Sequence, residues 1–248
     1  MRIGIITAMP EETQSVARAV GGTKRTLLNK LAIRQGHLPG HEIVIIEAGM
    51  GFNNAAATAQ KLVHAAHPDM IISAGFCGGI SAGLQVGDIV VATGLTIVSE
   101  NVLEQVPVEI LAASRNFVVR QSAEGRRVFA GLFASTPTIM PKSRLAALLP
   151  VDVPFPVVEM ESAAIAIVAV ENGISFSAIR AVSDPFDEEL GFSLDEFCDG
   201  RMRIRIPRVL LTIARKPHII PQLIRLARNS RVAAASLSQA VERFLAVV

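Results

Sequence analysis

The chain contains no tryptophan and no tyrosine, and only two cysteines, Cys77 and Cys198, among its 248 residues. Proteins that bind single-stranded nucleic acid usually stack the bases on aromatic side chains, so this composition argues against a nucleic-acid partner. Two cysteines at this spacing form neither a disulfide framework nor a zinc-ligand pattern, so we predict no metal site. We interpret both thiols as small buried hydrophobic side chains.

Long uncharged apolar runs are also missing, although half of the residues are hydrophobic and the mean hydropathy is +0.44. A membrane-spanning helix needs about 20 consecutive apolar residues. The first residues, MRIGIITAMPEE, lack the basic and long apolar segments of a signal peptide, which predicts a cytoplasmic protein that begins with a core strand. Charge is uneven: residues 201–248 hold ten Lys and Arg against one acid, whereas residues 1–200 hold 14 against 21 acids.

Short apolar runs alternate with helical patterns along the first 200 residues. We expect strands at 3–7, 42–48, 70–75, 88–93, 156–161 and 174–184, and helices at 11–19, 53–66 and 162–171. The strand at 70–75 is expected to end where Gly75, Gly78 and Gly79 begin to interrupt it. This alternation predicts an α/β fold with a central mixed, mainly parallel sheet flanked by helices. Residues 116–140 give no clear pattern.

A second pattern begins beyond residue 200. Apolar residues recur at helical spacing over 204–214 and again over about 222–246, interleaved with arginines and interrupted by Pro217 and Pro221. We therefore divide the chain into a domain at 1–200 and a basic amphipathic helical extension at 201–248, packed on or beside it.

Acidic residues lie at or after the ends of three predicted strands. Glu12 follows the first strand, Glu161 ends the fifth and Asp184 ends the last. Ligands of parallel sheets bind beyond the carboxyl ends of the strands, where the loops at 7–12, 49–51, 75–79 and 183–184 are expected to lie. Taken alone, the three acids mark only a candidate active site.

The surrounding motifs resemble the methylthioadenosine/S-adenosylhomocysteine nucleosidases and, more broadly, the purine nucleoside phosphorylase superfamily. The resemblance covers about residues 1–198 and rests on MRIGIITAMPEE, AGMGFNNAAATAQKLV, PDMIISAGFCGGISAGLQVGDIVV, VVEMESAAIAIVA, FSAIRAVSD and SLDEF. The tail segment RVLLTIARKPHIIPQLIRLARNSRVAAASL is similar to the C-terminus of hopanoid-associated phosphorylases, which are tied to the removal of adenine from adenosylhopane.

The resemblance implies cleavage of the N-glycosidic bond of an adenine nucleoside, without a cofactor. Asp184 matches the acid that protonates purine N7, because departing adenine is a poor anion. Glu161 matches the carboxylate that holds a ribose hydroxyl while the sugar becomes oxocarbenium-like. Glu12 matches the residue that orients the attacking water.

Other positions match substrate contacts of the same family. Ser183 corresponds to the residue beside the acid, and Met50 and Met160 to apolar contacts with the sugar. Gly75 and Phe76 lie in the segment that binds phosphate in phosphorylases, and Ile139 occupies the place of the aromatic residue that stacks on adenine.

The nucleophile is predicted to be water rather than phosphate. The phosphorylases' arginine is replaced by Ser73, Phe76 stands at the position of a hydroxyl, and the charge of Glu12 would oppose an anion. Backbone N–H groups at 75–79 could still hold an anion, so phosphorolysis remains an alternative. A methylthioadenosine/S-adenosylhomocysteine nucleosidase and a non-catalytic nucleoside-binding protein are further alternatives. A dinucleotide-binding dehydrogenase is disfavoured, because residues 75–79 lack the G-x-G-x-x-G spacing.

The basic extension has two interpretations. Arginines interleaved with Ile and Leu are typical of a peripheral contact with an anionic membrane, here through 201–246 at the inner membrane face, or of an apolar channel for a lipid. Alternatively, the helices cap the body or a sister subunit. Resemblance to the superfamily also implies a homo-oligomer, dimeric or higher.

Overall fold

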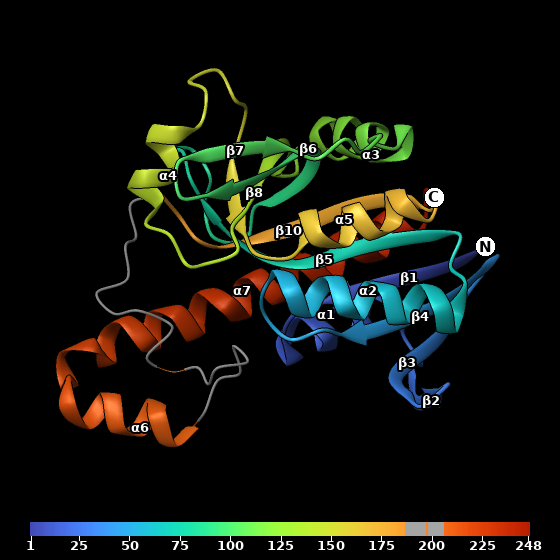
Figure 1. The fold of residues 1–248 in the computed structure, drawn as a ribbon, viewed down its shortest axis with the longest axis horizontal. Helices are drawn as coiled ribbons and strands as arrows, with labels where there is room; N and C mark the ends of the chain where they lie inside the picture. Colours follow the sequence, from blue (N-terminus) through green and yellow to red (C-terminus); the bar gives the residue numbers. More distant parts are fainter. Residues whose placement is uncertain (187–196, 198–205) are drawn as a thin grey trace.

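The computed structural model describes residues 1–186, Phe197 and 206–248. Its strands form one mixed sheet in the order β10-β6-β8-β9-β5-β1-β4-β3-β2, with β7 paired to β6 (Figure 1). The strands are β1 (Arg2–Thr7), β2 (Lys24–Leu28), β3 (Leu31–Leu38), β4 (His41–Glu47), β5 (Met70–Gly79), β6 (Ile89–Ser99), β7 (Val102–Gln105), β8 (Val128–Ser135), β9 (Val157–Glu159) and β10 (Ser175–Asp184).

Five of these strands close into a ring. Strand β5 pairs with β9 on one side and with β10 on the other, and β6 and β8 complete the circuit between them. Beyond the ring, β1 and β4 continue the sheet in parallel with β5, and the antiparallel hairpin β2–β3 ends it. Parallel β1, β5 and β10 therefore all end on one side of the sheet.

Helices cover both faces of the sheet. They are α1 (Pro10–Val20), α2 (Phe52–Ala66), α3 (Ala112–Ala123), α4 (Lys142–Leu148), α5 (Ser162–Glu171), α6 (Ile206–Arg215) and α7 (Ile220–Leu245), with a short 3₁₀ turn, η2 (Pro217–Ile219), before α7. Alternation along β4 sends Val44 and Ile46 into a core with α2 and α5, and Ile43 and Ile45 into a second core with α1 and α7.

The predicted mixed α/β fold is confirmed, and the expected strands and helices of residues 3–66 and 156–184 are present. The expected end of the strand at Gly75 is wrong, because β5 continues to Gly79 and stays paired with β10 as far as Asp184. Gly75 and Gly78 have no Cβ atom, and this leaves space for the side chains of Arg180 and Asp184 from β10. The segment 116–140, which gave no pattern, contains most of α3 and the whole of β8.

Helix α7 has two different halves. Its C-terminal half is buried, and Phe244 packs edge-on against Phe117 of α3 with ring centroids 5.4 Å apart. Its N-terminal half exposes Ile224, at 66% of its surface, beside exposed arginines. None of the helices in the described part of the chain is long and apolar enough to cross a membrane. The predicted boundary at residues 200/201, together with Cys198, lies outside the described residues.

Candidate active site

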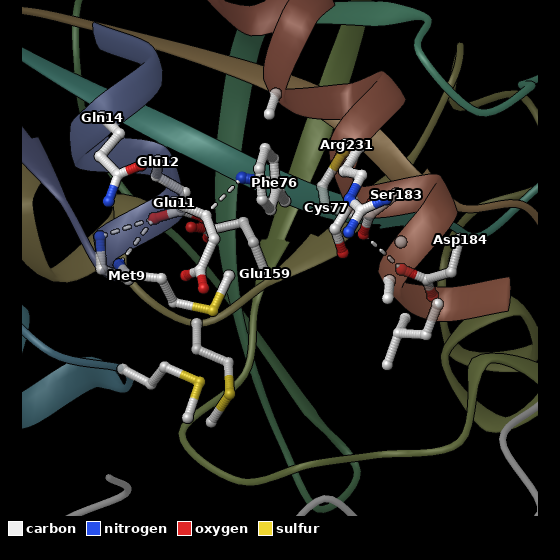
Figure 2. A pocket seen from close by; sticks show the side chains of 18 of the residues that line it. Met9, Glu11, Glu12, Gln14, Phe76, Cys77, Glu159, Ser183, Asp184 and Arg231 are labelled. Atoms are coloured by element: carbon white, nitrogen blue, oxygen red, sulfur yellow. Dashed lines mark hydrogen bonds between the residues drawn. The ribbon is translucent and has the colours of Figure 1, made fainter. Parts of the chain in front are cut away.

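The three predicted catalytic carboxylates line one cavity of about 650 Å³. Glu12 comes from the first turn of α1, Glu161 from the junction of β9 and α5, and Asp184 from the end of β10. Figure 2 shows Glu12 and Asp184 on opposite sides of the cavity, with Phe76 and Cys77 of β5 between them. The ends of three strands thus bring together acids that are far apart in the sequence.

Glu12 is held by three backbone amides. Pro10 starts α1, and Glu12 at its third position reaches back, so that its Oε2 accepts from the N–H groups of Ala8 and Met9 at 2.8 and 3.0 Å. Its Oε1 accepts from the N–H of Phe76 at 2.8 Å. Burial raises the pKa of Glu12 above its usual 4.5, although Arg180 and these amides act in the opposite direction. The carboxylate therefore occupies a ready-made anion site.

Glu161 lies at the N-terminal end of α5 and is also buried. Its Oε1 accepts a hydrogen bond from the N–H of Gly51 at 2.8 Å, which connects it to the loop after β4. Burial raises its pKa to about 7; Arg180 lowers it, while Glu159 and Glu12 raise it further. Near neutral pH this group is therefore poised between its acid and its carboxylate form.

Arg180, which the sequence analysis did not single out, is the buried cation of the site. It is 1% exposed, and its Nη2 donates to Ser73 Oγ at 3.1 Å and Ser162 Oγ at 3.0 Å and forms an ion pair with Glu159. Burial alone would lower the pKa of Arg180, but Glu159 and Glu161 raise it, so the guanidinium stays charged. The sequence did contain a signal for this role, because an arginine inside the apolar run 174–182 is expected to be buried. A buried charge needs a partner of opposite charge.

Glu159 supports Glu161 from below. Its Oε2 accepts from the N–H groups of Glu161 and Ser162 at 3.0 and 2.7 Å, which caps α5, and Ser135 donates to its Oε1. The sequence predicted no role for Glu159. Its ion pair with Arg180 makes it part of the site, but the two residues are far apart in the sequence, so no local pattern predicts the pair.

Asp184 has a partner on each carboxylate oxygen. Ser183 Oγ donates to Oδ1 at 2.9 Å, and Lys142 Nζ of α4 lies 2.5 Å from Oδ2. The predicted neighbour of the acid, Ser183, thus contacts it directly. Lys142 was not predicted, because nothing in its local sequence connects α4 with β10.

The remaining predicted contacts divide into two groups. Met50, Met160 and Phe76 line the cavity. Gly75 is not among its lining residues, and a Cβ atom there would collide with Arg180 and Glu12. Ile139 lies outside the residues that line the cavity and is 38% exposed between β8 and α4. Within the described ranges, no three His, Cys, Asp or Glu side chains gather as metal ligands.

The cavity also extends beyond the carboxylates along α7. Its walls there are the apolar side chains of Leu223, Leu226, Ala227 and Ala234, with Arg231 and Ser230 beside them. On the other side it is bounded by α1, including Gln14 and Arg18. The chemistry-bearing end and this apolar end are parts of one continuous space.

Comparison with known proteins agrees with this geometry. The family described as the phosphorylase superfamily matches residues 2–215. A 5'-methylthioadenosine/S-adenosylhomocysteine nucleosidase of Actinobacillus succinogenes is 32% identical over 213 residues, which cover 79% of this chain and 91% of that protein. A nucleosidase of the same name from Listeria monocytogenes is 30% identical over 214 residues, covering 79% and 92%.

Solved structures share the fold. A Helicobacter pylori 5'-methylthioadenosine/S-adenosylhomocysteine nucleosidase superposes with a TM-score of 0.75 at 18% identity, covering 100% of this chain and 99% of that one. The futalosine hydrolase of Helicobacter pylori gives 0.74 at 17% identity, covering 100% and 98%. From the family match, the sequence relatives and the shared architecture, we conclude that this chain belongs to the phosphorylase superfamily.

Proposed function

We propose that the protein hydrolyses the N-glycosidic bond of an adenine nucleoside and releases free adenine. The observation that carries this proposal is the meeting of Glu12, Glu161 and Asp184 in one cavity. The sequence relatives at 30–32% identity are named as nucleosidases of methylthioadenosine and S-adenosylhomocysteine, which supports the same reaction class.

Each acid has a separate task in this reaction. Protonated Asp184 gives its proton to N7 of the purine, and the bond between C1′ and the base breaks with its electron pair going to the base. Ionised Glu161 stabilises the positive charge that develops on the ribose. Glu12 takes a proton from water, whose oxygen bonds to C1′. The products are adenine and the free sugar. Glu12 then releases the proton that it took from water to the solvent, and Asp184 recovers its own proton from the solvent.

Water is favoured over phosphate because three amides that could hold an anion already donate to Glu12. The N–H groups of Ala8, Met9 and Phe76 all donate to Glu12. A phosphate would have to displace this carboxylate or lie beside its charge, and like charges repel strongly in a buried site. A phosphate therefore lacks these three donors while Glu12 is in place.

We further propose that the 5′-substituent of the nucleoside is large and apolar. The apolar wall of Leu223, Leu226 and Ala227 lies in the same cavity as the carboxylates. Pockets that bury drug-sized ligands have volumes of about 300–1,000 Å³, so a cavity of about 650 Å³ can hold a nucleoside with a sizeable attachment. Adenosylhopane is the specific candidate, because the tail resembles that of hopanoid-associated phosphorylases.

A product assay tests these proposals together. Methylthioadenosine, S-adenosylhomocysteine and adenosylhopane are each supplied with and without phosphate, and adenine and the sugar product are quantified by chromatography. We expect adenine and free sugar without phosphate, with the highest kcat/KM for adenosylhopane. Formation of a sugar 1-phosphate only when phosphate is present would instead establish phosphorolysis. Binding without any product would favour the non-catalytic alternative.

A peripheral membrane contact at the cytoplasmic face would bring the enzyme to a lipid substrate. Ile224 and Ile220 of α7 are exposed on the same helix as exposed arginines, which suits an anionic bilayer surface. We expect wild-type protein to sediment with anionic liposomes and the variant Ile224→Glu to remain in the supernatant. Val119→Glu, an equally exposed position on α3, is the control. Equal recovery of all three proteins would contradict this contact.

We also propose a homo-oligomer, dimeric or larger, as the superfamily resemblance implies. Sedimentation equilibrium of the purified protein measures the subunit number directly. A monomer at micromolar concentration would contradict the proposal without affecting the assignment of the reaction.

A further inference from the structure

Lys142, the first residue of α4, has its side chain turned inward toward Asp184. The side chain is 10% exposed, and its Nζ lies 2.5 Å from Oδ2 of Asp184. The same ammonium donates to the backbone carbonyl oxygens of Asp184 and Pro185 at 3.1 and 2.7 Å. A lysine ammonium has three N–H donors, so these acceptors on one short stretch of chain fix both the acid and the turn behind it.

Strand β5 leaves room for this pair. A Cβ atom at Gly78 would lie 2.7 Å from Oδ2 of Asp184 and 3.0 Å from Cε of Lys142. Real Cβ atoms essentially never come closer than 3.0 Å to another heavy atom, so a side chain at position 78 would force the carboxylate of Asp184 to shift. The absence of a side chain at Gly78 and the inward direction of Lys142 are two independent features that serve the same contact.

We propose that Lys142 is a positioning residue for Asp184: it fixes the carboxylate that protonates the base and sets how readily that carboxylate takes up its proton. This inference rests on the proposed function, in which Asp184 is the acid. An ammonium beside a carboxylate favours the ionised form. Lys142 therefore has two effects on Asp184. It holds the carboxylate in place, and it favours the ionised form, so that Asp184 loses its proton at a lower pH.

Other charged or titratable groups on this side of the cavity are less suited to the role. Arg231 of α7 lines the cavity, but it is exposed, so solvent screens its charge. Burial raises the pKa of the Cys77 thiol on β5 well above its usual value, so that group stays neutral. Arg180 is engaged by Glu159. Among the residues that the structure describes, Lys142 is the cation in direct contact with Asp184.

The test compares Lys142→Met, which removes the charge but keeps much of the length, with Lys142→Arg, which keeps the charge. The readout is the kcat of each variant relative to wild type across the pH range. An opposite charge at this distance lowers the protonation pH of a carboxyl by about 1–3 units. We therefore expect the relative kcat of Lys142→Met to rise at least about tenfold from acidic to alkaline pH, because each unit corresponds to tenfold. Lys142→Arg should follow the wild-type profile.

A purely structural role for Lys142 predicts a different result. Lys142→Met would then lose the same fraction of kcat at every pH, and a constant ratio would overturn the proposal. If Lys142→Met does not fold, Lys142→Gln is measured in the same way, with circular dichroism as the check of folding.

A second readout is independent of catalysis. The carboxyl carbon of Asp184 is titrated by NMR in protein labelled with ¹³C-aspartate, with Asp184→Asn identifying the signal. We expect Asp184 to take up its proton at a higher pH in Lys142→Met than in wild type, and an unchanged titration would overturn the proposal. If wild-type protein released no adenine, the proposed function would fail, whereas this titration would still decide whether Lys142 acts on Asp184.

Discussion

Arg180 is the buried cation that interacts with the acids at the centre of this site. Arg180 forms an ion pair with Glu159, and its Nη2 lies 3.5 Å from Oε2 of Glu161. Glu12 is close enough for Arg180 to affect its pKa. Because one positive charge cannot balance three carboxylates, burial leaves Glu161 with a pKa of about 7. The positive charge that develops on a bound ribose would favour its ionised form.

Replacing the proposed acid should remove most of the activity without unfolding the protein. Asp184→Asn keeps the shape of the side chain but has no acidic proton, and general acids contribute about 10²–10⁴-fold to rates. We expect kcat for adenine release to fall within that range while KM changes little. Asp152→Asn, at an exposed position, is the matched control. Wild-type kcat in Asp184→Asn would contradict the assignment.

The raised pKa of Glu161 makes stability depend on pH. Between the usual value of 4.5 and about 7, the folded protein binds more protons at this group than the unfolded chain does. The free energy of unfolding therefore falls as the pH rises through this window. Glu161→Gln should flatten this dependence, by an amount on the order of 1–3 kcal/mol. Urea denaturation at pH 5 and pH 7 measures it, and equal slopes in both proteins would refute it.

The three amides around Glu12 should accept a small anion once that side chain is removed. Glu12→Ala frees the N–H groups of Ala8, Met9 and Phe76, so we expect a loss of kcat that added formate partly restores. Glu12→Gln fills the same space and is the control, for which formate should have no effect. Absence of rescue in Glu12→Ala would show that the carboxylate acts through more than its position.

At the scale of single residues, the sequence indicated the three acids of the cavity but not the cations that pair with acidic residues there. Glu12, Glu161 and Asp184 lie in motifs that mark them locally. Arg180 and Lys142 are recognised only through partners more than 20 positions away, Glu159 and Asp184, and no local pattern indicates such pairings. The stacking position assigned to Ile139 lies outside the cavity walls.

At the scale of elements, β5 shows why glycine patterns can mislead. Glycines usually interrupt strands, yet β5 remains paired through Gly75 and Gly78. Their missing side chains admit Arg180 and Asp184 from the neighbouring strand. The strongly apolar runs of β1, β4 and β10 were predictable because burial on both faces leaves a continuous signal. Helix α3 lacks such a signal, because most of its residues remain exposed.

Filling the space at Gly75 should damage both stability and activity. The Cβ of Gly75→Ala would collide with Arg180 and approach Oε1 of Glu12 to 2.6 Å. Overpacking of this kind costs about 1–3 kcal/mol, and the displaced Glu12 should lower kcat as well. Gly94→Ala, where the nearest atom is a flexible leucine carbon at 3.2 Å, is the matched control in β6. We expect thermal denaturation and the adenine assay to show a lower stability and a lower kcat for Gly75→Ala than for Gly94→Ala. Equal values for the two variants would contradict this prediction.

At the scale of the whole molecule, α7 joins the core to the cavity. The sequence predicted its amphipathic pattern, but which residues would be buried depended on how the helix packs against α1, β5 and β10. Its C-terminal half is part of the central core, whereas Leu223 and Leu226 line the cavity. Deletion of 201–248 would therefore remove core residues such as Phe244 and is unsuitable as a test of membrane binding.

Substitutions in the two halves of α7 should have opposite signatures. Phe244→Ala should cost about 3–5 kcal/mol of unfolding free energy, because it empties a buried aromatic site. Leu226→Glu should leave stability nearly unchanged but lower kcat/KM for a nucleoside with an apolar 5′-group, while adenosine itself is cleaved as before. Equal loss with both nucleosides would show that Leu226 lies away from the 5′-substituent.

The two halves of α7 also bear on how such a protein can diversify. Its buried end is anchored against the sheet, so the partly exposed turns at the other end can drift in sequence without loosening the scaffold. Descendants of one ancestral gene could then acquire new preferences for the group attached to the sugar while the bond-breaking apparatus is inherited unchanged. Exchanging residues 220–231 between homologues should transfer the preference for the group attached to the sugar from one protein to the other.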